Sequence, residues 1–299
     1  MILYRVRNKI KRVFQKMKKN CIYQMLNCLR YDMKYIGTGV FVMKAKRVVE
    51  KKRIHVVASG PSIKKSLENT DNSDEFYMMN GLASTDYMQK YMVSTFFLFD
   101  PIFFDIPLVN ENAKAVWDDL NNHVSWDMKL IVPNRFEKVA FQMLENSRIR
   151  LLGVRDTGIL TENPKIDFFF YRHNLGIPPV GTVAMYAVYW AIQCGAKTIY
   201  LHGVDYSYEF EVDSENRIWQ LYQYADGRKV RNEMKKYENG KLWKLYETLA
   251  SEFKVFKWID LYAKSRNIEI LNASPTSKVD AYKKVLDGYE IGENIKKVY

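Results

Sequence analysis

Seven short apolar runs, rich in β-branched and aromatic residues, alternate with helix-like segments over most of this 299-residue chain. The runs lie at residues 54–58, 75–79, 95–99, 129–132, 148–152, 198–201 and 268–271. Strands separated by helix-length connections pair in parallel, and a parallel sheet is stable when helices cover both of its faces. The alternation therefore predicts an α/β fold with a Rossmann-type, mostly parallel sheet and helices on both faces.

The segments between these runs have helical periodicity. We expect helices at 63–69, 84–92, 183–194 and 241–266, the last with a break near 251–253. Further helices are expected before and after the 129–132 strand, and a final helix after the last strand.

Clusters of polar residues follow several of the predicted strands. They lie at residues 59–62, 80, 100, 203–205 and 272–277. Because parallel strands end at the same edge of a sheet, and ligands bind outside those carboxyl ends, the clusters predict one active site at this edge.

The first cluster, Ser59-Gly60-Pro61-Ser62, connects a strand to a helix. Glycine allows the backbone to approach a ligand closely, and the N–H groups that open the next helix can bind a phosphate. Ser62 could equally be an ordinary N-cap. The loop has neither the G-x-G-x-x-G spacing of a dinucleotide site nor a P-loop, which disfavours NAD and ordinary P-loop ATP binding.

A second segment runs from Gly181-Thr182, at the start of a helix, to Gly203-Val204-Asp205, at the end of the 198–201 strand. Asp205 is placed to accept hydrogen bonds from ribose hydroxyls, and the alternative is a carboxylate that caps a turn. The stretch that follows, residues 206–240, breaks the alternation and is aromatic and polar. We predict that it forms a hairpin or lid.

The basic residues concentrate at the N-terminus. Residues 1–53 contain sixteen Lys or Arg and two acids, whereas the net charge of the whole chain is +12. We therefore separate a basic segment, 1–52, from a catalytic domain, 53–299. Apolar residues recur at helical spacing within 1–20 opposite a basic face, which predicts a helix on an anionic membrane surface. The alternative is a helix packed on the domain with a solvated basic face.

Three cysteines form no disulfide framework, and the N-terminus lacks the apolar core of a secretion signal. We therefore expect a cytoplasmic protein that is peripheral at the inner face of the membrane.

The order and spacing of these motifs resemble the bacterial sialyltransferases of glycosyltransferase family forty-two and the related motility-accessory-factor proteins. The resemblance spans about residues 53–285 and rests on Ser59-Gly60-Pro61-Ser62, Asn80, Asp100-Pro101 and the Gly203–Tyr206 segment. It implies a GT-A-like sheet, a CMP-sugar donor, inversion at the anomeric carbon, and neither a metal nor another cofactor. The expected acceptor is a surface glycan, such as lipopolysaccharide or capsule, or a lipid-linked precursor.

The resemblance also implies roles for individual residues. Those expected to bind the donor are Ser59, Gly60, Pro61, Ser62, Asn80, Asp100, Thr182, Gly203, Asp205, Thr276 and Ser277. Tyr206 and Tyr208 are expected at the leaving phosphate, although the first tyrosine of the family aligns best with Ser207. The family's catalytic histidine has no counterpart after His202. Glu252 is the substitute base, or else a solvated helix residue.

Two other functions stay open. An ATP-dependent diphosphokinase of the pterin-linked branch would need Mg²⁺, and the chain has no D-x-D pair. A nucleic-acid-binding protein could use the basic N-terminus, but the near-neutral remainder has no recognised motif, so we expect no nucleic-acid partner. Self-association is left open.

Overall fold

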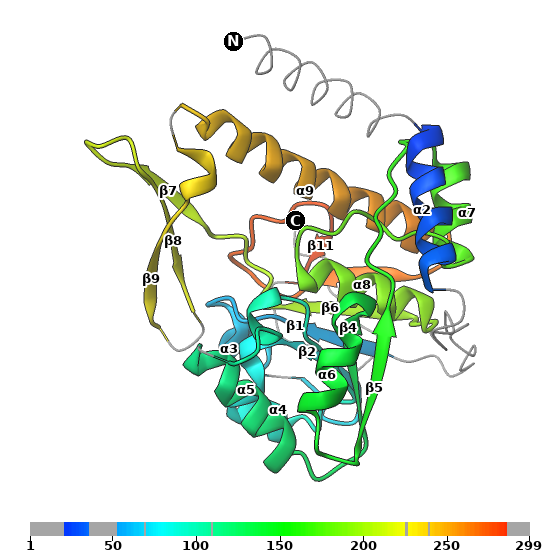
Figure 1. The fold of residues 1–299 in the computed structure, drawn as a ribbon, viewed down its shortest axis with the longest axis vertical. Helices are drawn as coiled ribbons and strands as arrows, with labels where there is room; N and C mark the ends of the chain where they lie inside the picture. The colour runs from blue at the N-terminus through cyan, green and yellow to red at the C-terminus, as the bar shows by residue number, and fades with distance from the viewer. Residues whose placement is uncertain are drawn as a thin grey trace.

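The computed structural model describes residues 21–35, 53–68, 70–108, 110–224, 227–238 and 240–285. Within them, eight strands form one sheet in the order β11-β10-β6-β1-β2-β3-β4-β5 (Figure 1). All of their pairings are parallel. The strands are β1 Arg53–Val57, β2 Glu75–Met79, β3 Thr95–Phe97, β4 Met128–Pro133, β5 Ile149–Val154, β6 Thr198–His202, β10 Glu269–Asn272 and β11 Lys283–Lys284.

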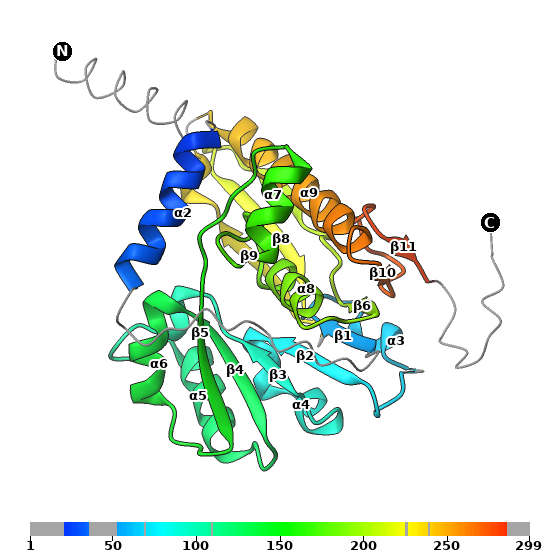
Figure 2. The same ribbon diagram turned by 90° about the vertical axis from the view of Figure 1, so that its right-hand side faces the viewer.

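Helices cover both faces of this sheet, and two apolar cores follow from the alternation of side chains along each strand. In β2, Tyr77 and Met79 belong to one core, and Phe76 and Met78 to the other. The first core is shared with α2 Cys21–Tyr35, α7 Pro164–Arg172, α8 Val183–Gln193 and α9 Leu242–Lys264. The second is shared with α3 Ile63–Ser66, α4 Asp86–Lys90, α5 Glu111–Asn122 and α6 Glu137–Met143. Figure 2 shows α7, α8 and α9 together above the sheet.

The strand order reverses beside β1. From β1 the chain adds β2 to β5 on one side, and it then returns to place β6 on the other side of β1. Such a reversal opens a crevice between the loops that leave the two central strands, which is where open α/β sheets bind ligands.

A separate antiparallel sheet interrupts the domain after β6. It consists of β7 Glu209–Val212, β8 Ile218–Gln223 and β9 Lys229–Glu233, and it projects to the side of the main body (Figure 1). On β8 the indole of Trp219 lies 4.0 Å from the Arg231 guanidinium and 5.6 Å from that of Arg217, measured to the ring centroid. Its N–H donates to Asp213. These contacts hold the small sheet in one shape.

The predicted fold class is confirmed by this topology. The structure has the parallel sheet, the helices on both faces and the lid, here a three-stranded sheet within 206–240. The basic helix predicted at 1–20 lies outside the described residues. No helix in the described ranges has the length and apolar character needed to cross a membrane.

One local prediction was wrong, and a second does not hold over the described residues. The predicted break near 251–253 does not occur, since α9 is continuous over 23 residues and this part of it packs on the root of the lid. The final helix is also absent from residues 273–285. There the backbone binds the end of β6 instead, with the Lys278 N–H donating to the Asp205 carbonyl. Helical periodicity cannot foresee hydrogen bonds to a distant strand.

Two histidines are buried inside the sheet. His55 Nδ1 lies 2.9 Å from His202 Nε2, and His55 Nε2 lies 3.0 Å from the Asp74 carboxylate, which also binds Arg53. Burial lowers the pKa of His55 despite Asp74, and it lowers the pKa of His202 well below its usual value. Both imidazoles are therefore neutral in the folded protein at neutral pH.

This pair makes folding sensitive to mild acid. The unfolded chain takes up protons on both histidines below about pH 6.5, while the folded state resists them, so the stability present above that pH is lost as pH falls through it. We expect the free energy of unfolding to fall by about 1 kcal/mol or more between pH 7.5 and 5.5, measured by urea denaturation. His202→Asn should flatten this dependence, and the exposed His123→Asn should not. Equal slopes in both variants would contradict the assignment.

Candidate active site

A cavity of about 400 Å³ opens where the strand order reverses. The loops that follow β1 and β6 form one wall, the start of α8 forms a second, and β8 of the lid forms a third. Ten residues predicted from the sequence line it: Ser59, Gly60, Pro61, Asn80, Asp100, Thr182, Gly203, Asp205, Tyr206 and Tyr208. The polar clusters that follow separate strands therefore meet at one site.

The loops after β1 and β6 touch through two glycines. The Gly60 N–H donates to the Gly203 carbonyl over 2.9 Å, and a Cβ on Gly60 would lie 2.3 Å from an Asp205 oxygen. Gly203 has a φ of +64°, and its own Cβ would collide with the Ala58 carbonyl. Glycine is thus required at both positions by close backbone approach, and at Gly203 also by conformation.

Asp205 fastens this junction. Its Oδ2 accepts the Ser62 N–H over 2.9 Å, and its Oδ1 lies 3.5 Å from the Thr276 hydroxyl. Ser277 donates to the Val204 carbonyl. Ser62, Thr276 and Ser277, expected at the donor, therefore lie behind the cavity wall and hold Asp205 and its loop. Asp205 itself reaches the wall, and a carboxylate can accept more than the two bonds made here.

Asn80 has two features of a ligand-binding residue. It follows β2 with a φ of +50°, a left-handed conformation that is strained for a side chain other than glycine. Its Oδ1 is buried and has no hydrogen-bond partner among the described residues, although Asn80 lines the cavity. A buried acceptor left unpaired costs free energy, and a donor group on a ligand would satisfy it.

Two further residues of the cavity wall are N-caps of helices. Asp100 accepts the Ile102 N–H and starts a short 3₁₀ helix, Pro101–Phe103. Thr182 is the N-cap of α8, and residues 181–184 line the cavity, so the positive end of this helix faces it. The site thereby has a place suited to a negatively charged group.

Tyr206 lies at the root of the lid and carries a second strained backbone, with a φ of +51°. Its hydroxyl donates to Glu252 of α9 over 3.1 Å, and its ring packs edge-on against Phe253 and Phe256. Burial raises the pKa values of Tyr206, Tyr208 and Glu252. Glu252 does not line the cavity, but its neighbour Gly181 does. A Cβ added to Gly181 would lie 2.6 Å from a carboxyl oxygen of Glu252.

Sequence reasoning missed the wall that β8 supplies. Gln220 and Tyr222 alternate along β8, Tyr224 directly follows it, and all three line the cavity together with Gln223. The hydroxyls of Tyr222 and Tyr224 lie 3.1 Å apart. The alternation was visible in the sequence, but nothing there showed which face of the lid turns toward the sheet.

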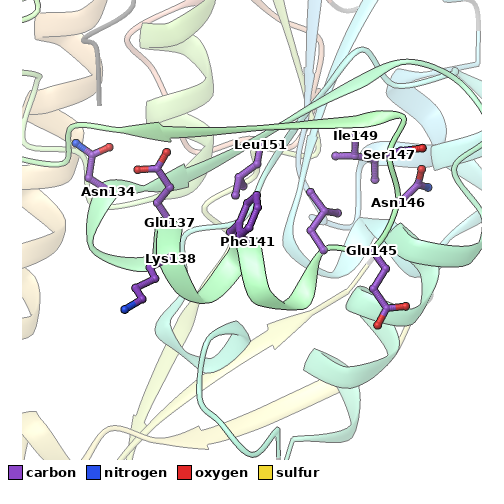
Figure 3. A pocket seen from close by; sticks show the side chains of 10 residues that line it. Asn134, Glu137, Lys138, Phe141, Glu145, Asn146, Ser147, Ile149 and Leu151 are labelled. Atoms are coloured by element: carbon purple, nitrogen blue, oxygen red, sulfur yellow. The ribbon is translucent and has the colours of Figure 1, made fainter. Parts of the chain in front are cut away.

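A second hollow, of about 780 Å³, lies at the far edge of the sheet between α6 and β5. Figure 3 shows Phe141 of α6 alongside Leu151 of β5, with Glu137, Lys138 and Glu145 around them. Although it is larger, none of the predicted site residues lines it, and it lies away from the reversal of strand order. We therefore take the smaller cavity as the candidate active site.

Among the described residues, no group of three or more His, Cys, Asp or Glu is arranged to hold a metal ion. The metal independence implied by the resemblance stays a prediction.

Comparisons with known proteins give matches among solved structures. No family model and no curated protein match the chain. Among solved structures, sialyltransferase CstII from Campylobacter jejuni with CMP-3FNeuAc has 17% identity and a TM-score of 0.42, over 79% of this chain and 86% of that one. The α-2,3-sialyltransferase Cst-I from the same organism has 15% identity and a TM-score of 0.42, over 78% and 79%. Both of those proteins are sialyltransferases.

The glycine contact can be tested with a matched pair of variants. Gly60→Ala should lower the free energy of unfolding by about 1–3 kcal/mol, because its Cβ would force Asp205 and the β6 loop apart. Gly81→Ala is the control, since a Cβ there meets nothing within 4 Å, and it should change stability by less than about 0.5 kcal/mol. Urea denaturation of both variants measures the difference. Similar values for the two would show that the junction is not tightly packed.

Proposed function

We propose that this chain is an inverting, metal-independent glycosyltransferase that transfers sialic acid or a similar sugar from a CMP-sugar to a bacterial surface glycan. The observation that carries the proposal is the unpaired, buried Oδ1 of Asn80 in a cavity that also holds Asp205 and the start of α8. An acceptor for a ligand N–H or O–H, a carboxylate near the Gly-Pro-Ser loop, and a helix N-terminus suit a nucleoside monophosphate.

In this proposal the donor spans the junction of the β1 and β6 loops. The ribose hydroxyls donate to Asp205, and the phosphate lies toward the N-terminus of α8 at Thr182. Tyr208 supplies a hydroxyl to the phosphate as it leaves, whereas the one O–H of Tyr206, expected there as well, donates to Glu252. One phosphate needs less charge neutralisation than a diphosphate, so hydroxyl and N–H donors can stabilise the leaving CMP. This also makes the diphosphokinase the weaker alternative.

The acceptor hydroxyl must lose a proton as it attacks the anomeric carbon. We assign this proton to Glu252 through Tyr206, because Tyr206 lines the cavity and its hydroxyl donates to the Glu252 carboxylate. As the acceptor gives its proton to the Tyr206 oxygen, the tyrosine passes its own to Glu252. The C–O bond to CMP breaks as the new glycosidic bond forms. Burial raises the Glu252 pKa, which makes it a better proton acceptor than an ordinary carboxylate.

The donor assignment is tested by nucleotide binding. A hundredfold excess of CMP over its Kd should stabilise the fold by about 2.7 kcal/mol, seen as a rise in Tm, while ATP should have no effect. Asn80→Ala should reduce this rise. Asn134→Ala, in the wall of the second hollow, should not.

Turnover gives the second arm of this test. CMP-Neu5Ac or CMP-Kdo should be hydrolysed or transferred in the presence of EDTA. Stabilisation by ATP with Mg²⁺, or activity on UDP- or GDP-sugars alone, would refute the proposal.

The proton path predicts non-additive variants. Tyr206→Phe and Glu252→Gln should each lower kcat by about 10²–10⁴-fold, and the double variant should be little worse than either single one. Because Glu252 must be ionised and its pKa is raised, the acid limb of the kcat/KM profile should lie above the usual carboxyl range and disappear in Glu252→Gln. Additive losses, or an unchanged acid limb, would assign the base elsewhere.

A further inference from the structure

The helix α2 packs on the apolar core but exposes a row of aliphatic side chains to solvent. Leu26 and Leu29 are 57% and 48% exposed, and Ile22, one turn earlier, is 67% exposed. Their spacing of four and three residues places them in one stripe along the helix, which we call the α2 stripe. An amphipathic helix normally buries such a stripe and leaves its polar residues in water.

Polar bonds hold α2 in this orientation. The Gln24 side chain donates to the Leu160 carbonyl over 3.1 Å and accepts the Leu160 N–H over 2.7 Å. The Cys28 carbonyl accepts from the buried Arg155 guanidinium, and the Cys28 side chain belongs to the main core. Turning the α2 stripe inward would break all of these contacts. Its exposure is therefore set by the docking of the opposite face.

The size and surroundings of the stripe indicate its partner. Three aliphatic side chains are far fewer than the roughly 20–30 residues per side of a stable protein interface. They lie within the first 53 residues of the sequence, which contain sixteen basic residues and two acidic ones. Inserted aliphatic groups beside a strongly cationic segment match a bilayer with anionic headgroups, since each basic residue near such a surface adds about 1 kcal/mol.

We propose that the α2 stripe inserts into an anionic membrane surface and fixes how the protein sits there. In Figure 1, α2 and the lid strands β7, β8 and β9 lie on opposite sides of the molecule. Docking through α2 therefore leaves the lid, and the cavity that β8 lines, free of the membrane. This inference does not depend on the reaction catalysed, and it uses the charge of residues 1–53 without requiring a helix at 1–20.

Vesicle binding of the full chain tests the proposal. Wild type should bind vesicles that contain phosphatidylglycerol, bind pure phosphatidylcholine vesicles weakly, and lose binding as salt rises. Leu26→Asp should weaken binding about tenfold, because it removes an inserted side chain and adds a charge that an anionic surface repels. Leu26→Asp with Leu29→Asp should weaken it further.

Phe141→Asp is the matched control. It adds the same charge at an exposed apolar residue, 74% exposed, on α6 in the wall of the second hollow. It should bind vesicles nearly as well as wild type, and circular dichroism should show both variants folded. Equal losses in Leu26→Asp and Phe141→Asp would overturn the proposal, as would wild type that does not bind. A dimer in sedimentation that Leu26→Asp converts to monomer would assign the stripe to a second copy instead.

Discussion

The candidate site depends on the close contact between the loops that leave β1 and β6. Gly60 and Gly203 let the two backbones meet, and Asp205 spans them by accepting the Ser62 N–H. A Cβ added to Gly60 would lie 2.3 Å from the Asp205 carboxylate, so no larger residue fits at this position unless the two loops move apart. Because both loops line the cavity, the junction sets the geometry of this wall.

Two residues with strained backbone conformations lie in the wall of the same cavity. Asn80 and Tyr206 both adopt left-handed backbone conformations in the cavity wall, and conformations of this kind cost about 1–3 kcal/mol each. The surrounding packing maintains them: Tyr206 is held by Glu252, Phe253 and Phe256 of the unbroken helix α9. Local cost at the site is offset by contacts from distant parts of the chain, which is a common arrangement where a side chain must point at a ligand.

The lid and α2 show how the periphery is ordered by different means. The lid has little core of its own and keeps its shape through the Trp219 contacts with two arginines and Asp213. The helix α2 is docked by hydrogen bonds of the Gln24 side chain with the Leu160 backbone and of the Arg155 side chain with the Cys28 carbonyl, and its aliphatic stripe is outward. The lid strands lie at one side of the molecule and α2 at the other (Figure 1).

The sequence by itself determined β1 to β6 and β10, their parallel arrangement and the edge at which Ser59, Asn80, Asp100 and Asp205 collect. These follow from local periodicity, because residues after parallel strands share one edge. Only the tertiary structure decided what lies in the wall and what lies behind it. Thr276 and Ser277 support Asp205, Glu252 reaches the site through Tyr206, and Tyr222 faces the cavity. The same holds for α2, whose exposed face is the apolar one. Such contacts join residues far apart in the chain, and packing between elements, not the pattern within one, selects them.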